Sequence, residues 1–263
     1  MRSKCIGGDS SDSRAQSIGK HIFCTIEMRR FGLVGKSLQH SQSLSHFTEK
    51  FQREGIADAS YALFELLDID QWSAWISAEE KNPSGPLCGL NVTIPYKQSI
   101  IQHLSGLTAE ASSIGAVNAI RPDGQQGWVG HNTDALGFAQ SIRPFLTSKH
   151  ERALILGNGG AAAAVRFALQ NLGLDVAHVT RTPHEGWNTV RYEEISKEAV
   201  RFYGLIVQAT PVGTYPNLTD VLPFPWEGLT PDHLVIDLIY NPAETAFLRM
   251  ARAHGATVLN GKD

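Results

Sequence analysis

The sequence predicts an α/β protein made of two consecutive α/β units. From Phe31 onward, short apolar runs alternate with amphipathic stretches of helical length, and a second series of the same kind begins at Ala153. A polar stretch, Ser141–Arg152, separates the two series. Strands that alternate with helices imply a mainly parallel sheet covered on both faces. We therefore expect one domain at residues 29–140 and a second at residues 141–263.

The elements of the first unit follow from apolar periodicity and from glycine and proline breaks. The turn Pro122-Asp123-Gly124 lies between two short apolar runs and predicts a hairpin. We expect strands at 31–34, 61–66, 88–92, 116–121 and 127–130, and helices at 43–54, 69–80, 96–104, 110–113 and 133–144.

The second unit is predicted from the same signals. Gly173 marks the end of its first helix, as a residue that adopts the left-handed conformation at a helix terminus. We expect strands at 153–156, 176–180, 205–208, 234–238 and 257–259, and helices at 161–172 and 243–254.

Composition excludes several classes of protein. The 263 residues carry a formal net charge of −3, so no basic surplus would recruit nucleic acid. Apolar runs such as Ala161–Val165 fall far short of the ~20 residues needed to cross a bilayer. The 3 cysteines form no CxxC pair or cluster with histidine, so we expect no metal site and a cytoplasmic, reducing location.

The first residues differ from the rest of the chain. Residues 1–28 are polar and serine-rich, and they lack the apolar core of a secretory signal. Patterned sequence begins abruptly at Met28. We expect residues 1–28 to be a disordered or artefactual extension, of which residues 1–27 would precede a natural start at Met28.

A glycine-rich turn opens the second unit. Gly157, Gly159 and Ala162 have the Gly-x-Gly-x-x-Gly/Ala spacing, directly after a strand and at the start of a helix. This spacing lets the backbone approach a pyrophosphate, and the free N–H groups of the helix N-terminus stabilise its charge. We expect a Rossmann-like dinucleotide-binding domain whose turn residues hold the cofactor: Gly157, Asn158, Gly159, Gly160 and Ala161. The alternative is a tight turn without a ligand.

The end of the next strand indicates which dinucleotide would bind. Sites that prefer NAD carry Asp or Glu there, to bind the ribose 2′-hydroxyl. Here the strand ends in Thr180-Arg181-Thr182. A guanidinium attracts a 2′-phosphate, and the two threonine hydroxyls can donate to it, so NADP is favoured. The alternative is that Arg181 is an ordinary exposed arginine.

Three polar segments follow predicted strands of the first unit: residues 40–43, 89–97 and 130–137. Because ligands bind beyond the carboxyl ends of strands, we expect these segments to share one cleft. Ser41 and Ser43 can offer hydroxyls to a carboxylate, although a plain N-cap is the more common role of an isolated serine. Lys97 can move a proton, and Asp134 can hold its ammonium group while accepting from a substrate hydroxyl. Taken alone, a surface lysine and a capping aspartate are the ordinary alternatives.

Seven strings, in this order, resemble the successive signatures of shikimate dehydrogenases. They are FGLVGKSLQHSQSLSHF at 31–47, GLNVTIPYK at 89–97, IGAVNA at 114–119, GHNTDALG at 130–137, LGNGGAAAA at 156–164, TRTP at 180–183 and DLIYNP at 237–242. Agreement in order and spacing across both units is far more specific than any one of the strings.

The resemblance implies a two-domain oxidoreductase, with an N-terminal substrate domain, that reduces 3-dehydroshikimate with NADPH in aromatic amino-acid biosynthesis. It implies that Lys97 transfers the proton, with Asp134 as its partner. It also implies substrate contacts from Ser41, Ser43, Thr93, Asn118, Asp134 and Tyr240, and further cofactor contacts from Leu238 and Gly261. The expected partner is the small-molecule substrate, with the chain as a monomer or homodimer.

Some positions depart from the family pattern. Leu44 replaces a common proline, Gln208 an asparagine and Thr214 a methionine, the last two near the expected nicotinamide pocket. Family members also continue beyond the Asn260-Gly261 turn with a helix that returns to the first domain, so we expect exposed apolar surface here. Two alternatives remain: an NAD-using quinate/shikimate dehydrogenase, and a truncated fragment that binds shikimate or nucleotide without turnover.

Overall fold

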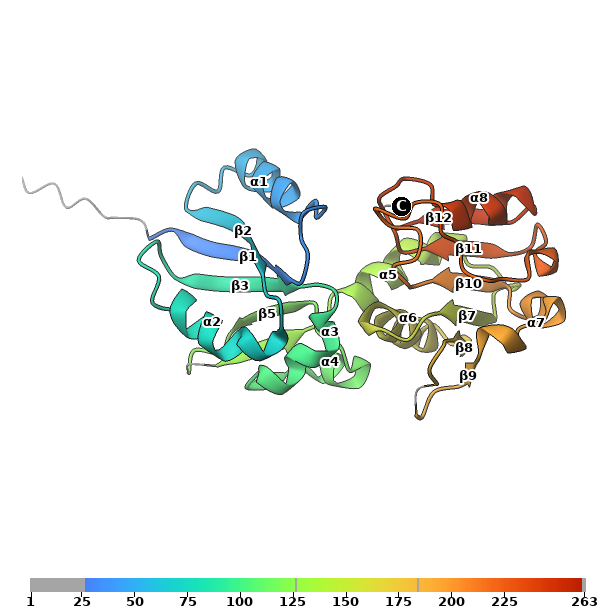
Figure 1. The fold of residues 1–263 in the computed structure, drawn as a ribbon, viewed down its shortest axis with the longest axis horizontal. Coiled ribbons are helices and arrows are strands. Elements are labelled where there is room, and N and C mark those ends of the chain that lie inside the picture. Colours follow the sequence, from blue (N-terminus) through green and yellow to red (C-terminus); the bar gives the residue numbers. More distant parts are fainter. Residues whose placement is uncertain (1–26, 126, 184, 262–263) are drawn as a thin grey trace, which may run out of the picture.

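The computed structural model describes residues 27–125, 127–183 and 185–261 and contains two six-stranded sheets. The first sheet is formed by strands between residues 29 and 131, and the second by strands between residues 152 and 260. The two sheets lie in separate lobes side by side (Figure 1). The predicted α/β class with two mainly parallel sheets is confirmed, whereas the extension at 1–28 lies almost entirely outside the described residues.

The first sheet has the strand order β2-β1-β3-β5-β6-β4. All its neighbours are parallel except those of β5, which runs antiparallel to both β3 and β6. Its strands are β1 (Arg29–Gly35), β2 (Ala59–Glu65), β3 (Leu87–Val92), β4 (Gly106–Leu107), β5 (Ala119–Pro122) and β6 (Trp128–His131). Its helices are α1 (Ser43–Arg53), α2 (Trp72–Glu79), α3 (Tyr96–Ser99), α4 (Ala109–Ile114) and α5 (Asp134–Ile142).

The second sheet is parallel throughout, in the order β12-β11-β10-β7-β8-β9. Every residue of the central strands β10 and β11 is buried, as expected for a parallel sheet covered on both faces. Its strands are β7 (Arg152–Leu156), β8 (Asp175–Val179), β9 (Thr189–Val190), β10 (Leu205–Gln208), β11 (Leu234–Asp237) and β12 (Thr257–Asn260). Its helices are α6 (Gly160–Asn171), α7 (Lys197–Phe202) and α8 (Ala246–Ala253).

The sequence prediction missed three short elements and misplaced several boundaries. The strands β4 and β9 have 2 residues each, too few to show a period of two. The six-residue helix α7 begins after the Ser196 cap and is too short for a clear apolar stripe. α8 begins at Ala246 rather than at 243, because Thr245 is its N-cap. Among the described helices, none has the length and apolar character needed to span a membrane.

Small side chains join the two lobes. Ala135 of α5 and Ala116 lie in one buried cluster with Ala163, Ala164 and Ala168 of α6. Alanine allows close approach of the two helices, so α5, which follows the last strand of the first sheet, packs directly along α6. This packing sets the carboxyl-end loops of the two sheets near each other.

A buried carboxylate fixes the loop after β11. Asp237 is fully buried, and its Oδ2 accepts a hydrogen bond of 2.7 Å from the hydroxyl of Thr245, while its Oδ1 accepts the N–H of Ile239 at 3.0 Å. The same Thr245 oxygen caps α8 by accepting the N–H of Leu248. Burial raises the pKa of Asp237 to about 6.

Replacing Asp237 by asparagine should therefore remove a pH dependence of stability. Because its folded pKa of about 6 exceeds the ordinary value of 3.8, the native state holds more protons than the unfolded state between these pH values. From about pH 4 to about pH 6, wild type should lose free energy of unfolding relative to Asp237→Asn. Urea unfolding of both proteins at several pH values checks this, and a pH-independent difference would contradict it.

Candidate active site between the two sheets

The carboxyl ends of the two sheets meet at Lys97 and Gly160. Lys97 lies in α3, just after β3, and Gly160 is the first residue of α6, after β7. A Cβ atom built on Gly160 would lie 2.7 Å from Cβ of Lys97 and 3.4 Å from Cβ of Ala116. A real Cβ does not fit at that distance, so glycine is required for the two segments to touch. The glycine-rich turn and the predicted catalytic lysine are thus direct neighbours.

Lys97, Asp134 and Asn118 form one hydrogen-bonded group. Nζ of Lys97 donates to Oδ2 of Asp134 at 2.6 Å, and Nδ2 of Asn118 donates to Oδ1 of the same carboxylate at 2.6 Å. Oδ1 of Asn118 accepts the N–H of Thr133 at 2.9 Å, which fixes the orientation of the amide. The carboxylate is therefore held from both sides, and the ammonium group has a defined position.

The ion pair is only partly open to solvent. The side chain of Lys97 is 18% exposed and that of Asp134 34% exposed. Proton transfer needs a group that a substrate can reach and that a partner holds in place. Both conditions are met here, so the arrangement can deliver a proton to, or take one from, a ligand placed against Nζ.

The segment that carries Ser41 and Ser43 is anchored to the first sheet. The N–H of Leu38 donates to Oε1 of Glu65 at 2.6 Å, and the N–H of Ser41 donates to the carbonyl of Leu38 at 2.9 Å. Oγ of Ser41 accepts the N–H of Ser43, the first residue of α1, at 3.2 Å. Both serines are half-buried at the start of the helix. Thr93 follows β3, and its N–H donates to the carbonyl of Val34 in β1.

Tyr61 of β2 is a neighbour of this segment that the sequence analysis did not single out. Its hydroxyl donates to Oδ1 of Asn91 at 2.8 Å, and Ser43 lies close enough to lower the pKa of this hydroxyl slightly against the effect of burial. Its ring stacks on Phe47 with centroids 4.4 Å apart. Burial raises the pKa of Tyr61, so the phenol keeps its proton. A tyrosine within a strand looks like core in the sequence, and only the fold brings it to Ser43.

The glycine-rich turn leaves room for a ligand. Gly157 has φ +119°, a conformation that favours glycine, and its N–H donates to the carbonyl of Val179 at 2.8 Å. A Cβ built on Gly159 would meet no atom within 4 Å. Asn158 and Ala161 complete the turn around this open space at the N-terminus of α6. The backbone N–H groups at the N-terminus of α6 are donors of the kind that bind a pyrophosphate.

The turn after β8 is built by its own side chains. Oγ1 of Thr180 accepts the N–H of Thr182 at 3.2 Å and donates to the carbonyl of Thr182 at 2.9 Å. That carbonyl also accepts Nδ2 of Asn158 at 3.0 Å, which ties this turn to the glycine-rich turn. Thr180 is buried and its proton is used within the turn, whereas Arg181 and Thr182 are exposed.

The remaining predicted residues lie in loops at the same edge of the second sheet. The N–H of Leu238 donates to the carbonyl of Gln208 at 3.0 Å, and a Cβ on Gly261 would contact the carbonyl of Leu238. Tyr240 follows in the same loop and is 43% exposed. Gln208, buried at the end of β10, donates from Nε2 to the carbonyl of Val212 at 3.0 Å. Gln208 therefore holds the next loop in place.

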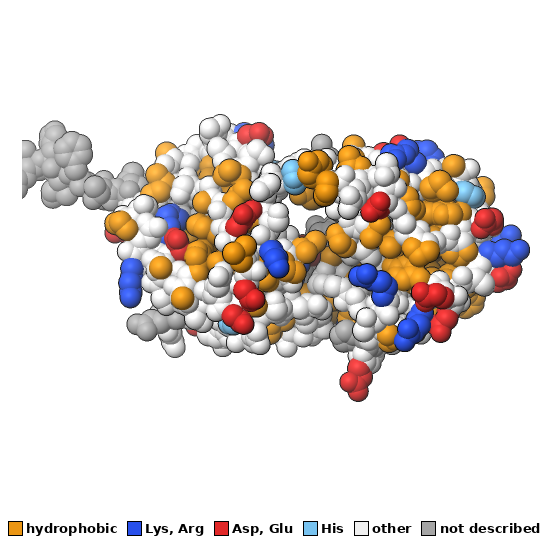
Figure 2. All heavy atoms as spheres, in the orientation of Figure 1, with side chains coloured by type: hydrophobic (Ala, Val, Ile, Leu, Met, Phe, Trp, Pro, Cys, Tyr) orange, Lys and Arg blue, Asp and Glu red, His pale blue; other side chains and the backbone are white. Residues whose placement is uncertain are grey.

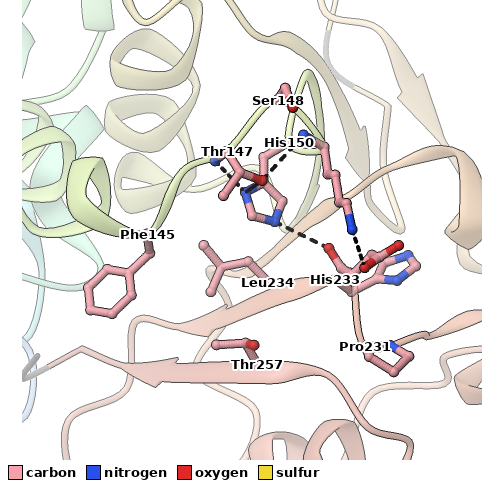
Figure 3. A pocket seen from close by; sticks show the side chains of 10 residues that line it. Phe145, Thr147, Ser148, His150, Pro231, His233, Leu234 and Thr257 are labelled. Atoms are coloured by element: carbon pink, nitrogen blue, oxygen red, sulfur yellow. Dashed lines mark hydrogen bonds and ion pairs between the residues drawn. The ribbon is translucent and has the colours of Figure 1, made fainter.

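A different hollow, of about 310 Å³, lies at the opposite edge of the second sheet, where β7, β11 and β12 begin (Figure 3). His150 points into the loops there, and both of its ring nitrogens have backbone partners, the N–H of Thr147 and the carbonyl of Asp232. The ring therefore holds loops together. Within the ranges 27–125, 127–183 and 185–261, no group of three His, Cys, Asp or Glu side chains could hold a metal ion.

Known proteins resemble this chain over most of its length. Residues 33–120 match the family model described as shikimate dehydrogenase substrate binding domain. Shikimate dehydrogenase (NADP(+)) of Shouchella clausii is 33% identical over 247 residues, covering 89% of this chain and 87% of that protein.

Two solved structures are also similar. Shikimate 5-dehydrogenase from Thermus thermophilus, in complex with NADP(H) and shikimate, has a TM-score of 0.75 and 31% identity, over 89% of this chain and 87% of that one. Quinate dehydrogenase from Corynebacterium glutamicum, in complex with NAD, has a TM-score of 0.75 and 26% identity, over 89% and 88%. On the strength of the identity and coverage of the Shouchella clausii enzyme, the chain belongs to the shikimate dehydrogenase family.

Proposed function

We propose that the chain is an NADP-dependent shikimate dehydrogenase, which interconverts 3-dehydroshikimate and shikimate in the route to chorismate. The observation that carries this function is the 2.6 Å contact between Lys97 and Asp134 directly beside Gly160 of the glycine-rich turn. The direct test is formation of NADPH from shikimate and NADP by the purified chain. Absence of NADPH would reject the enzyme and favour the non-catalytic binding protein.

The first domain, residues 29–140, would bind the substrate. Ser41 and Ser43 offer hydroxyls to its carboxylate, beside the N-terminus of α1. Ring hydroxyls would be bound by Thr93, Asn118 and Asp134, and Tyr240 would approach from the second domain. Support comes from the spacing of these groups around the carboxyl end of the first sheet.

The second domain, residues 141–263, would hold NADP. Gly157, Asn158, Gly159, Gly160 and Ala161 would surround its pyrophosphate, and Leu238 and Gly261 would lie near its nicotinamide. The 2′-phosphate would contact Arg181 and Thr182, with Thr180 shaping their turn through its two hydrogen bonds. No acidic residue takes the place of Arg181 in this turn, which favours NADP over the NAD of the quinate/shikimate alternative.

The chain's own groups supply the proton chemistry. When bound, NADP(H) supplies or accepts the hydride. The ammonium group of Lys97 stabilises the negative charge that develops on the substrate oxygen and gives that oxygen its proton. Asp134 holds the ammonium in place, and Asn118 holds Asp134. In the reverse direction Lys97 removes the proton from the hydroxyl.

Replacing Lys97 by alanine should lower kcat with little change in shikimate affinity. The lysine's interaction grows mainly in the transition state, so its loss affects the rate more than ground-state binding. We expect a loss on the order of 10²- to 10⁴-fold in kcat. Steady-state kinetics and calorimetric shikimate binding check this, and a kcat near the wild-type value would remove Lys97 from the mechanism.

Two neighbouring glycines should respond differently to alanine. In Gly160→Ala the new methyl group would collide with Cβ of Lys97, so kcat should fall even at saturating NADP. In Gly159→Ala the methyl group enters open space that the pyrophosphate would use, so KM for NADP should rise instead. The two variants are matched controls for each other. Identical effects on kcat and KM would contradict this assignment.

Replacing Arg181 by aspartate should raise KM for NADP and improve the use of NAD. A carboxylate repels the 2′-phosphate and can bind a ribose 2′-hydroxyl. Comparing kcat/KM for the two cofactors in wild type and variant tests this. An unchanged KM for NADP would mean that the guanidinium points elsewhere.

Location and assembly stay predictions. We propose a cytoplasmic enzyme, on the basis of its 3 cysteines without paired spacing, that acts as a monomer or homodimer on its small-molecule substrate.

A further inference from the structure

Two exposed rings meet across the groove between the lobes. His40 lies in the loop between β1 and α1, and Tyr215 in the loop after β10. Their ring centroids are 4.1 Å apart at an interplanar angle of 52°. Figure 2 shows a histidine against a hydrophobic side chain at the top of this groove. Tyr215 is 57% exposed, so the contact lies outside the cores of both lobes.

Both rings are presented by well-anchored loops. The loop of His40 is fixed by Leu38, which is buried and donates its N–H to the carboxylate of Glu65 at 2.6 Å. The loop of Tyr215 is fixed by Gln208, through its bond to the carbonyl of Val212. The hydroxyl of Thr214 also donates to the carbonyl of Pro211 at 2.7 Å. The ring contact between these two anchored loops is therefore a contact between the two lobes in addition to the packing of α5 on α6.

Each loop also adjoins one half of the site. His40 immediately precedes Ser41, and Ser43 follows two residues later. On the other side, the loop after β10 backs the glycine-rich turn, because a Cβ on Gly157 would lie 3.0 Å from Cγ2 of Thr210. The ring contact therefore joins the segment that would bind the substrate carboxylate to the segment beside the dinucleotide.

We propose that His40 and Tyr215 are positioning residues. Their ring contact, here called the latch, joins the two domains across the groove and holds the segment of Ser41 and Ser43 at a suitable distance from the glycine-rich turn. This role rests on the proposed function. Hydride transfer requires the two reactants to be held within a narrow range of distance, and a misplacement of about 1 Å can cost ~10²-fold in rate. The packing of α5 on α6 joins the domains on one side, and the ring pair joins them across the groove.

A double-mutant cycle tests the latch. His40→Ala and Tyr215→Ala should each lower kcat/KM for shikimate by about two- to tenfold, the range expected for loss of an aromatic contact. The double variant should lose no more than the worse single variant, because both changes remove the same contact. Tyr215→Phe keeps the ring and should rescue kcat/KM. The control Leu218→Ala removes another exposed apolar side chain of the same loop.

Two further readouts separate a latch from general damage. The affinity for NADP in the absence of shikimate should change by less than about twofold in every latch variant. The second domain alone would bind NADP, so its affinity does not depend on the contact between the domains. In NMR spectra of protein with isotope-labelled histidine, the ring current of Tyr215 should shift the signals of the His40 ring. That shift should disappear in Tyr215→Ala and persist in Tyr215→Phe.

The outcomes distinguish the two proposals. A wild-type chain that forms no NADPH from shikimate rejects the proposed function, and this role with it. An active wild type in which the two alanine effects multiply, or in which Tyr215→Ala leaves the His40 signals unchanged, rejects the latch alone.

Discussion

The contact between Gly160 and Lys97 is the constraint on which the rest of the site depends. It requires a residue without a side chain at the start of α6, and it brings the carboxyl end of β7 against the segment after β3. The small side chains between α5 and α6 make the approach possible. Once the two edges meet, an ammonium group, a carboxylate and the glycine-rich turn lie together, although they come from distant parts of the chain.

The carboxylate of Asp134 does two tasks that the fold makes compatible. It is the first residue of α5, where its negative charge favours the helix N-terminus, and it also holds Lys97. Asn118 keeps it in one orientation. The structure does not bear out the capping interpretation of Asp134, because its side chain makes no cap hydrogen bond and the N–H of Ala135 donates to Asn132 instead. The catalytic role of Asp134 stays a proposal. At the start of α1, Ser41 accepts the N–H of Ser43, whereas the binding of a substrate carboxylate by the two serines stays a proposal.

Much of the fold could be predicted because each long element has a clear local signal. The buried strands β10 and β11 each begin with three consecutive apolar residues, and α6 begins at a glycine-rich turn and ends before Gly173. Elements of two residues, such as β4 and β9, exist only because a longer strand lies beside them, so no local pattern could reveal them. The turn Thr180–Thr182 was predicted as a phosphate site, but the use of the Thr180 proton within that turn appears only in three dimensions. Tyr61 and the pair His40–Tyr215 act through distant partners and have no sequence signal of their own.

The most direct measurement of the central claim is a crystal structure of the chain with shikimate and NADP. The account predicts that Nζ of Lys97 lies about 2.6–3.2 Å from the hydroxyl that is oxidised. It also predicts that the pyrophosphate lies on the turn at Gly159. Shikimate bound away from Lys97, or a dinucleotide bound away from that turn, would contradict it.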